Sequence, residues 1–331
     1  MIRHFLADDD LSPSEQAEVL ALAGKLKTDP YAVRSFAGPR CVAVLFDKPT
    51  LRTQSSFAAG IAELGGYPMM VDGRLAGIGD RESVADTARV LGRQAAAIVW
   101  RTFAQSALGE MAEYSGVPTV NALTDSFHPC QILADLLTII ERFGRLSGLR
   151  LAYVGDGANN MASSYLLGGA TAGLHVRIGA PGDFLPDPVI VGRAEAIAAR
   201  TGGSVMVTTS AEEAVAGSEV VATDTWVSMG QEVTGRESVF VPYAVTAELF
   251  ALAAENAIVL HCLPAYRGKE IAAEVIDGPR SAVWDEAENR RHVQKAVLVF
   301  LDAASRGETT ESLTRRGGPS SDPLDDRRDD R

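Results

Sequence analysis

The chain has 331 residues, of which 46% are hydrophobic and 22% are charged, and its formal net charge at pH 7 is -12. This amount of apolar material supports a sizeable core, and the length suggests two domains of ordinary size. The acidic balance argues against binding to nucleic acid or to an anionic membrane. An anionic substrate would therefore have to be held by a local cluster of cations and backbone N–H groups.

The three cysteines, Cys41, Cys130 and Cys262, are far apart and form no CxxC pair. This spacing predicts neither a disulfide framework nor a structural zinc site. The first ten residues lack the apolar run of a signal peptide, and no stretch approaches the ~18 apolar residues of a membrane span. We therefore expect a cytoplasmic protein.

Strand-like and helical segments alternate through the first half of the chain. The first helix is expected after Ser12, because Ser12 and Glu15 form a capping box and Pro13 suits a first helical turn. The apolar run at 41–46 predicts a strand that ends before Pro49. Further strands are expected at 69–71, 96–100 and 118–122, and helices at 53–65, 82–93, 105–114 and 129–143.

The alternation resumes in the second half with a strand at 149–154. Strands are then expected at 175–178, 204–208, 219–223 and 258–262, with helices at 191–201 and 287–304. Strands separated by helices indicate an α/β protein with two doubly wound parallel-sheet domains linked by long helices. We predict one domain over 1–146, a second over 147–286, a helix at 287–304 that packs back on the first domain, and a disordered tail at 305–331.

Residues 49–53 lie at a strand-to-helix junction and include Thr50, Leu51, Arg52 and Thr53. Free backbone N–H groups and partial positive charge at a helix start suit a phosphate, and an arginine can add two charge-assisted hydrogen bonds. The alternative is an ordinary helix cap with a surface arginine. A second helix start carries His128 and Gln131 about one turn apart, so that both can face one carbonyl-containing ligand.

The turn at 155–160, with the sequence GDGANN, resembles a dinucleotide-binding fingerprint only in part. Asn160 stands where the third glycine belongs, and the strand at 175–178 ends without an acidic residue to hold a ribose. A turn that presents amide side chains to a polar substrate fits better, with a nucleotide-dependent oxidoreductase as the alternative.

Three more segments carry polar groups at strand ends or at a helix start. Asp224 and Ser228 follow a strand, where a carboxylate suits an ammonium group, although a polar capping loop would look the same. Cys262 lies in a His-Cys-Leu-Pro run, and the sequence specifies no adjacent base that could activate its thiol. A buried structural thiol is therefore favoured over a covalent nucleophile. Arg290 could point from the last helix into a cleft.

Taken in order, these segments resemble the aspartate/ornithine carbamoyltransferase family, and its ornithine branch more closely. The resemblance runs from His4 to about Ala304. It depends on the phosphate loop, the HPCQ helix start, the GDGANN turn, the DTWVSMG loop and the HCLP and AENR segments.

The resemblance implies transfer of a carbamoyl group from carbamoyl phosphate to the δ-amine of L-ornithine, giving L-citrulline. Carbamoyl phosphate would be bound by residues of the first domain, the HCLP segment and the last helix: Thr50, Leu51, Arg52, Thr53, Arg101, His128, Gln131, Leu263 and Arg290. Ornithine would be bound by Asn160, Asp224, Ser228, Met229 and Cys262. The resemblance implies catalytic roles for Arg101, His128, Asp224 and Cys262, no metal or organic cofactor, and a trimer or an assembly of trimers with active sites between subunits.

Two segments depart from the family pattern. The family loop usually reads Ser-Thr-Arg-Thr-Arg, whereas this chain has Leu51 at the second position and Gln54 in place of the second arginine. Gly77 stands where a glutamine from the neighbouring subunit commonly lies. Gln54 and Gly77 leave open a homologue with weakened catalysis. A second alternative keeps the reaction class and changes the acceptor to another amine, such as an acylated ornithine or putrescine.

Overall fold

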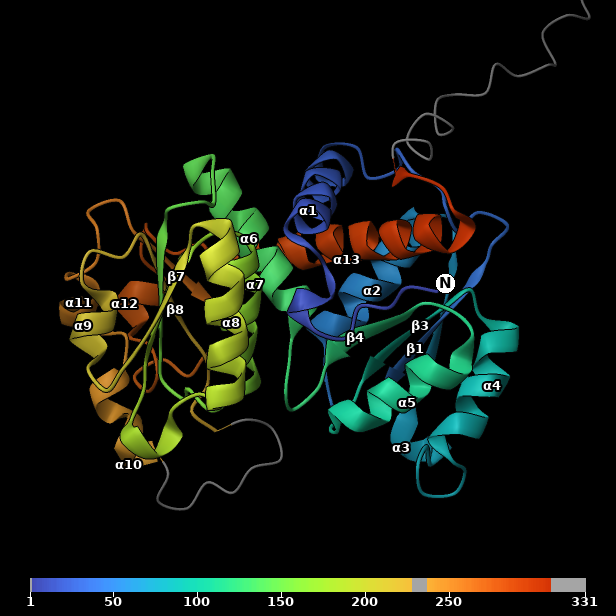
Figure 1. Cartoon of the computed structure of the whole chain (residues 1–331), viewed down its shortest axis with the longest axis horizontal. Coiled ribbons are helices and arrows are strands. Elements are labelled where there is room, and N and C mark those ends of the chain that lie inside the picture. The colour runs from blue at the N-terminus through green and yellow to red at the C-terminus, as the bar shows by residue number, and fades with distance from the viewer. Residues whose placement is uncertain (1, 228–236, 311–331) are drawn as a thin grey trace, which may run out of the picture.

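The computed structural model describes residues 2–227 and 237–310. Two lobes lie side by side (Figure 1), and each contains one parallel sheet covered by helices. The predicted fold class is therefore confirmed. The predicted ornithine ligands Ser228 and Met229 lie outside the described residues.

The first lobe contains a four-stranded sheet in the order β2-β1-β3-β4. Its strands are β1 (Cys41–Phe46), β2 (Tyr67–Asp72), β3 (Ala97–Arg101) and β4 (Thr119–Leu123). The apolar runs of β1 and β3 are almost wholly buried, as expected for inner strands covered on both faces. The helices between them are α2 (Arg52–Glu63), α3 (Gly73–Ala76), α4 (Val84–Gln94) and α5 (Gln105–Ser115).

The second lobe contains a five-stranded sheet in the order β7-β6-β5-β8-β9. Its strands are β5 (Arg150–Val154), β6 (His175–Gly179), β7 (Ser204–Thr208), β8 (Val220–Thr223) and β9 (Ile258–His261). Its helices are α7 (Asn160–Thr171), α8 (Pro188–Thr201), α9 (Ala211–Val215), α10 (Glu237–Phe240), α11 (Ala247–Phe250) and α12 (Ala273–Ile276), and short 3-10 turns lie at Asp8–Asp10, Gly182–Phe184 and Val241–Tyr243.

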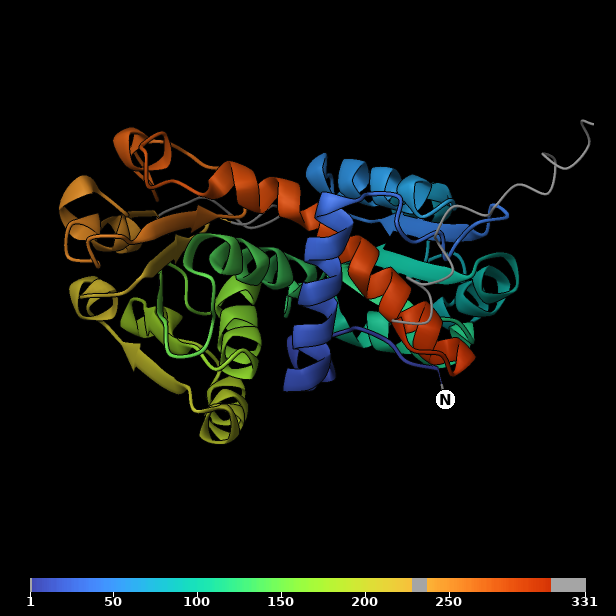
Figure 2. The same cartoon turned by 90° about the horizontal axis from the view of Figure 1, so that it is seen from above.

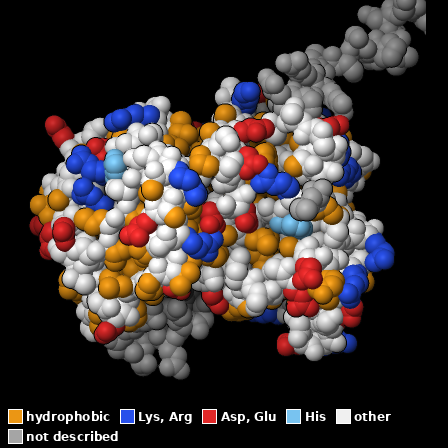
Figure 3. Space-filling model, in the orientation of Figure 1, with side chains coloured by type: hydrophobic (Ala, Val, Ile, Leu, Met, Phe, Trp, Pro, Cys, Tyr) orange, Lys and Arg blue, Asp and Glu red, His pale blue; other side chains and the backbone are white. Residues whose placement is uncertain are grey.

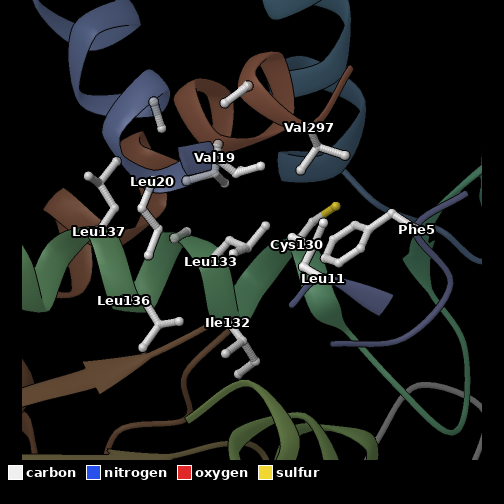
Figure 4. Close-up of a cluster of buried hydrophobic side chains, with 14 of the residues drawn as sticks. Phe5, Leu11, Val19, Leu20, Cys130, Ile132, Leu133, Leu136, Leu137 and Val297 are labelled. Atoms are coloured by element: carbon white, nitrogen blue, oxygen red, sulfur yellow. The ribbon is translucent and has the colours of Figure 1, made fainter. Parts of the chain in front are cut away.

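Three long helices join the lobes: α1 (Pro13–Thr28), α6 (Pro129–Phe143) and α13 (Val283–Arg306). α1 crosses α13 near the middle of the molecule (Figure 2), and α13 packs on α1, α2 and α6. Figure 4 shows Leu133 and Leu137 pointing from α6 toward α1, while Ile132 and Leu136 point toward the second lobe. One hydrophobic core therefore runs through both lobes, with α6 at its centre.

The helix ends follow the predicted capping chemistry. Ser12 and Glu15 form the capping box of α1, and Gly144 ends α6 with a φ of 71°, a left-handed conformation that glycine adopts without strain. The prediction for the last helix was too short at both ends. α13 begins at Val283 and ends at Arg306. In its final turn the Ser305 hydroxyl donates to the Leu301 carbonyl at 2.8 Å. The rest of the predicted tail, from 311 onward, lies outside the described residues.

The carboxyl ends of the strands decide where a ligand can bind. In each sheet the strand order reverses once, between β1 and β3 in the first lobe and between β5 and β8 in the second. Such reversal points open a crevice at the carboxyl ends of parallel strands. The segments singled out from the sequence follow these strand ends. Among the helices of the described ranges 2–227 and 237–310, none combines the length and apolarity needed to cross a membrane.

Candidate active site

A pocket of about 170 Å³ lies where the strand ends of the two lobes face each other. It draws its lining from both lobes and from α13. The lining residues are Lys48, Thr50, Arg52, Arg101, Leu123, Asp125, His128, Ala158, Asn159, Asn160, Met161, Asp224, Thr225, Val227, Cys262, Leu263, Pro264, Tyr266 and Arg290.

One side of this pocket, here called the cationic wall, is formed by Arg52, Arg101 and Arg290. Arg101 and Arg290 are buried, and both guanidinium groups donate to the Thr53 hydroxyl, at 3.4 Å and 2.8 Å. Burial, and then the charge of Arg290, lowers the pKa of Arg101 to about 10, so it remains a cation at neutral pH. Three cations this close together repel one another, which makes the wall a site for an anion.

The phosphate loop supplies backbone groups beside this wall. The Thr50 hydroxyl accepts a hydrogen bond from the Thr53 N–H at 3.3 Å, which shapes the first turn of α2. Leu51 occupies the N-cap position with its side chain 76% exposed, and it does not line the pocket. Leu51 can therefore serve a ligand only through its backbone.

His128 lies at the start of α6, between the cationic wall and the second lobe. Its backbone N–H donates to the Ser164 hydroxyl at 2.9 Å, which ties this helix start to α7. Burial, and then the charges of Arg290 and Arg101, lowers the pKa of His128 well below its ordinary value. The imidazole is thus neutral near pH 7. Within the described part of the chain its Nδ1 has no hydrogen-bond partner.

Gln131 is fully buried and is not among the residues that line the pocket. Its amide nitrogen donates to Asp135 at 2.9 Å and to Glu286 at 2.7 Å. The structure therefore places Gln131 directly behind the site and not on its surface, with its carbonyl oxygen unpaired among the described residues.

The opposite side, here called the polar wall, is formed by Asn160, Asp224 and Cys262. The Cys262 thiol donates to the Asp224 carboxylate at 3.2 Å. Burial raises the pKa of Asp224, while burial and the neighbouring Asp224 charge raise the pKa of Cys262 well above its ordinary value. Cys262 is therefore a thiol at neutral pH, which disfavours nucleophilic attack by its sulfur.

Leu263 and His261 shape the strand end that carries Cys262. Leu263 has a φ of 59°, a conformation that costs a bulky residue energy and is concentrated at functional sites. The Leu263 N–H donates to Nδ1 of His261 at 2.9 Å, and Nε2 of His261 lies 3.2 Å from Glu270. Leu263 is thus held in place by His261, and it lines the pocket.

Asp224, His261 and Cys262 also offer three potential metal-ligand atoms within 4.8 Å of one another. However, the two hydrogen bonds of His261 occupy both of its ring nitrogens, and they place its proton on Nε2, facing Glu270. The thiol of Cys262 is already a donor to Asp224. These contacts describe a hydrogen-bonded cluster.

Comparisons with known proteins agree with this arrangement. A family described as "Aspartate/ornithine carbamoyltransferase" matches by its carbamoyl-P binding domain over residues 3–141 and by its Asp/Orn binding domain over residues 147–301. The chain belongs to the aspartate/ornithine carbamoyltransferase family. It is 60% identical over 307 residues to an ornithine carbamoyltransferase of Renibacterium salmoninarum, covering 91% of this chain and 99% of that one.

Solved structures of the same family superpose over most of the chain. The ornithine carbamoyltransferase of Gloeobacter violaceus is 46% identical with a TM-score of 0.81, covering 89% of this chain and 97% of that one. The enzyme of Pyrococcus furiosus is 38% identical with a TM-score of 0.86, covering 90% and 96%.

Within this carbamoyltransferase fold, Lys48 is a pocket residue that the sequence reasoning missed. It is buried, forms an ion pair with Asp125, and its Nζ lies 4.5 Å from the centre of the Phe103 ring. Its position directly after β1, at the reversal point of the sheet, could have pointed to it. Asn159 was also missed as a lining residue, although an asparagine that caps α7 was readable from the sequence.

Gln54 and Gly77, which depart from the family pattern, do not line the active-site pocket. Gln54 is exposed on α2 and borders a neighbouring hollow together with Lys48 and Arg74. Gly77 ends α3 with a φ of 68°, and a Cβ there would approach the Arg81 side chain to 3.0 Å. A glutamine at this position would be strained in the present loop conformation.

Proposed function

We propose that this carbamoyltransferase moves the carbamoyl group of carbamoyl phosphate to the δ-amine of L-ornithine, giving L-citrulline and phosphate. The observation that carries the proposal is the pairing of a cationic wall with a carboxylate and a neutral thiol across one small pocket. On the face shown in Figure 3, acidic and basic side chains are interspersed. Because the formal net charge of the chain is -12, an anionic donor has to be attracted by the local cations of the pocket.

In this proposal the cationic wall holds carbamoyl phosphate. Thr50, Thr53 and the backbone of Leu51 bind the phosphate with Arg52, while Arg101 and His128 donate to the carbamoyl oxygen. Gln131, the backbone near Leu263 and Arg290 complete the donor site. Losing one donor to an oxygen that gains negative charge typically costs ~10²–10³ in rate.

The polar wall holds ornithine. Asp224 and Asn160 orient the amino acid together with Ser228 and Met229, and Cys262 lies near the δ-amine. An amine of this type has a pKa of about 10.4 in water, and partial burial favours the neutral form that can attack. The nitrogen lone pair forms a bond to the carbonyl carbon, the carbon–oxygen bond to phosphate breaks, and the departing phosphate takes the proton that the nitrogen loses.

The same proposal covers the organisation of the chain. Residues 1–146 form the carbamoyl-phosphate lobe, residues 147–286 form the ornithine lobe, and the final helix packs back on the first. We further propose a homotrimer, or an assembly of trimers, with its sites at subunit boundaries, in the cytoplasm. Leu51 and Leu75 are the most exposed large hydrophobic residues of the described chain, at 76% and 82%, and a neighbouring subunit could cover them. Light scattering that finds only monomers would contradict the trimer.

The direct test supplies the purified protein with millimolar carbamoyl phosphate and ornithine and measures citrulline and phosphate. N-acetylornithine, putrescine and aspartate serve as alternative acceptors. Phosphate release that depends on one of these, without citrulline from ornithine, would redirect the proposal to that acceptor. Binding of carbamoyl phosphate without turnover of any amine would indicate a homologue that has lost catalysis.

A further inference from the structure

Two carboxyl groups are buried side by side behind the pocket, on different helices. Asp135 lies on α6 and Glu286 on α13, each is completely buried, and both accept a hydrogen bond from the amide nitrogen of Gln131. The mechanism outlined above gives neither group a role. Two ionised carboxylates buried side by side in a protein would repel each other strongly. The pair is therefore stable only if nearby cations offset the charge or if one carboxyl group keeps a proton.

The donors around the pair account for all four carboxyl oxygens. Asp135 accepts from the Gln131 amide at 2.9 Å and from the Tyr165 hydroxyl at 2.6 Å. Glu286 accepts from the same Gln131 amide at 2.7 Å and from the His261 backbone N–H at 2.8 Å. Four elements, α6, α7, α13 and β9, therefore meet at this pair.

The pair decides which way the Gln131 amide points. An ionised carboxylate only accepts hydrogen bonds, so the NH₂ end of the amide must face it, and both N–H groups are used there. The carbonyl oxygen of Gln131 then faces away from the pair, and it is buried without a partner in the described residues. The bond to His261 meanwhile anchors the strand end from which Cys262 and Leu263 reach the pocket.

We propose that Asp135 and Glu286 share a single proton and act as positioning residues that set the Gln131 amide for the carbamoyl group. A pair with one negative charge balances the positive charge of the buried Arg290. It leaves the positive potential of Arg52 and Arg101 available for an anionic donor. Burial raises the pKa of Asp135 to about 6, and burial together with the charge of Asp135 raises the pKa of Glu286 well above its ordinary value, which agrees with a retained proton. The catalytic part of this inference rests on the proposed function.

The shared proton is tested by infrared spectroscopy on the purified protein. A protonated carboxyl has a C=O stretch that an ionised one lacks. Because one proton is shared, Glu286→Gln and Asp135→Asn are each expected to remove the same band at pH 7.5. Asp285→Asn, which changes an exposed neighbour on α13 paired with Arg142, should leave that band intact. Two separate bands, or no band lost in either variant, would overturn the proposal.

The positioning role is tested by a double-mutant cycle with Gln131→Ala. Glu286→Gln is expected to lower kcat/KM for carbamoyl phosphate roughly tenfold and to change the KM for ornithine by less than about twofold. In the Gln131→Ala background the same change should cost less than about twofold, because the pair acts through Gln131. Additive losses, or an equal effect on both substrates, would show a merely structural role.

Tyr165→Phe provides a milder second variant if the amide substitutions do not fold. It removes one donor to Asp135 and should give a smaller loss, about threefold, that also vanishes in the Gln131→Ala background. A loss that persists there would contradict positioning through Gln131. If the unaltered protein makes no citrulline, the proposed reaction fails, while the infrared result still decides whether the proton is shared.

Discussion

The cationic wall and the polar wall of the pocket bury different kinds of polar group. Arg101 and Arg290 are positive charges whose nearest neighbours include further cations, and their Nε atoms have no partner in the described residues. On the polar wall Asp224 already accepts from Cys262 and from the Thr225 N–H at 2.7 Å. The cationic wall therefore has guanidinium donors that an anion could pair. The polar wall already has its carboxylate hydrogen-bonded, which suits it to orient a ligand.

This difference suggests that the two walls make separate contributions. The cationic wall should dominate binding and activation of carbamoyl phosphate, at a cost to the stability of the empty protein. The polar wall should govern only the amine. A mutation or a change of pH should therefore be able to perturb one wall without the other.

The largest effect is expected for Arg101→Leu. Removing a buried guanidinium that we propose donates to the carbamoyl oxygen should lower kcat/KM for carbamoyl phosphate by ~10²–10³. Thermal unfolding should show a Tm that is unchanged or higher, because a buried cation among cations is lost. Arg93→Leu, on the exposed end of α4, is the control and should alter neither quantity. A lower Tm with intact kinetics would remove Arg101 from the site.

The next largest effect is expected for Asp224→Asn, which keeps an oxygen for Thr225 and Cys262 but removes the charge. The kcat/KM for ornithine should fall about 100-fold, since a buried ammonium would lose its counter-charge. The KM for carbamoyl phosphate should stay within about twofold of the unaltered protein. Asp277→Asn, in an exposed ion pair with Arg267, is the control. Equal losses for both substrates would show that the walls are not separable.

The two walls should also differ in their pH dependence. Between pH 7 and 9 His128, with its lowered pKa, stays neutral, and Arg101, with a pKa of about 10, stays charged. The kcat/KM for carbamoyl phosphate should therefore be nearly flat. The kcat/KM for ornithine should rise by up to about tenfold per pH unit, because its amine loses a proton as pH increases. A bend near pH 7 to 8 in the carbamoyl phosphate profile would reveal a titrating group on the cationic wall.

The smallest effect is expected for Gln54→Arg, which restores the second arginine of the family loop. Gln54 is exposed, so an added cation should lower the KM for carbamoyl phosphate only about two- to fivefold, and less at high salt. Gln94→Arg, exposed at the end of α4, is the charge-matched control and should have no effect. A higher KM would mean that the loop around Gln54 has adapted to the absence of that charge.

Local sequence determined the elements of this protein and the type of side chain at each strand end. The capping box of Ser12 and Glu15, the glycine at 144 and the buried runs of β1 and β3 could be predicted because each depends on residues a few positions apart. The position of Arg52, His128, Asp224 and Cys262 after strands or at helix starts was readable for the same reason.

Only the tertiary structure decided which of these groups meet. Thr53 accepts from Arg101 and from Arg290, which are 48 and 237 residues away in the sequence, and Gln131 is oriented by Glu286 at a separation of 155 residues. No local pattern specifies such pairs, because they depend on how α13 crosses α1 and packs on α2 and α6. The placement of Gln131 behind the pocket, the pairing of Lys48 with Asp125 and the joining of two carboxyl groups around one amide all follow from that packing.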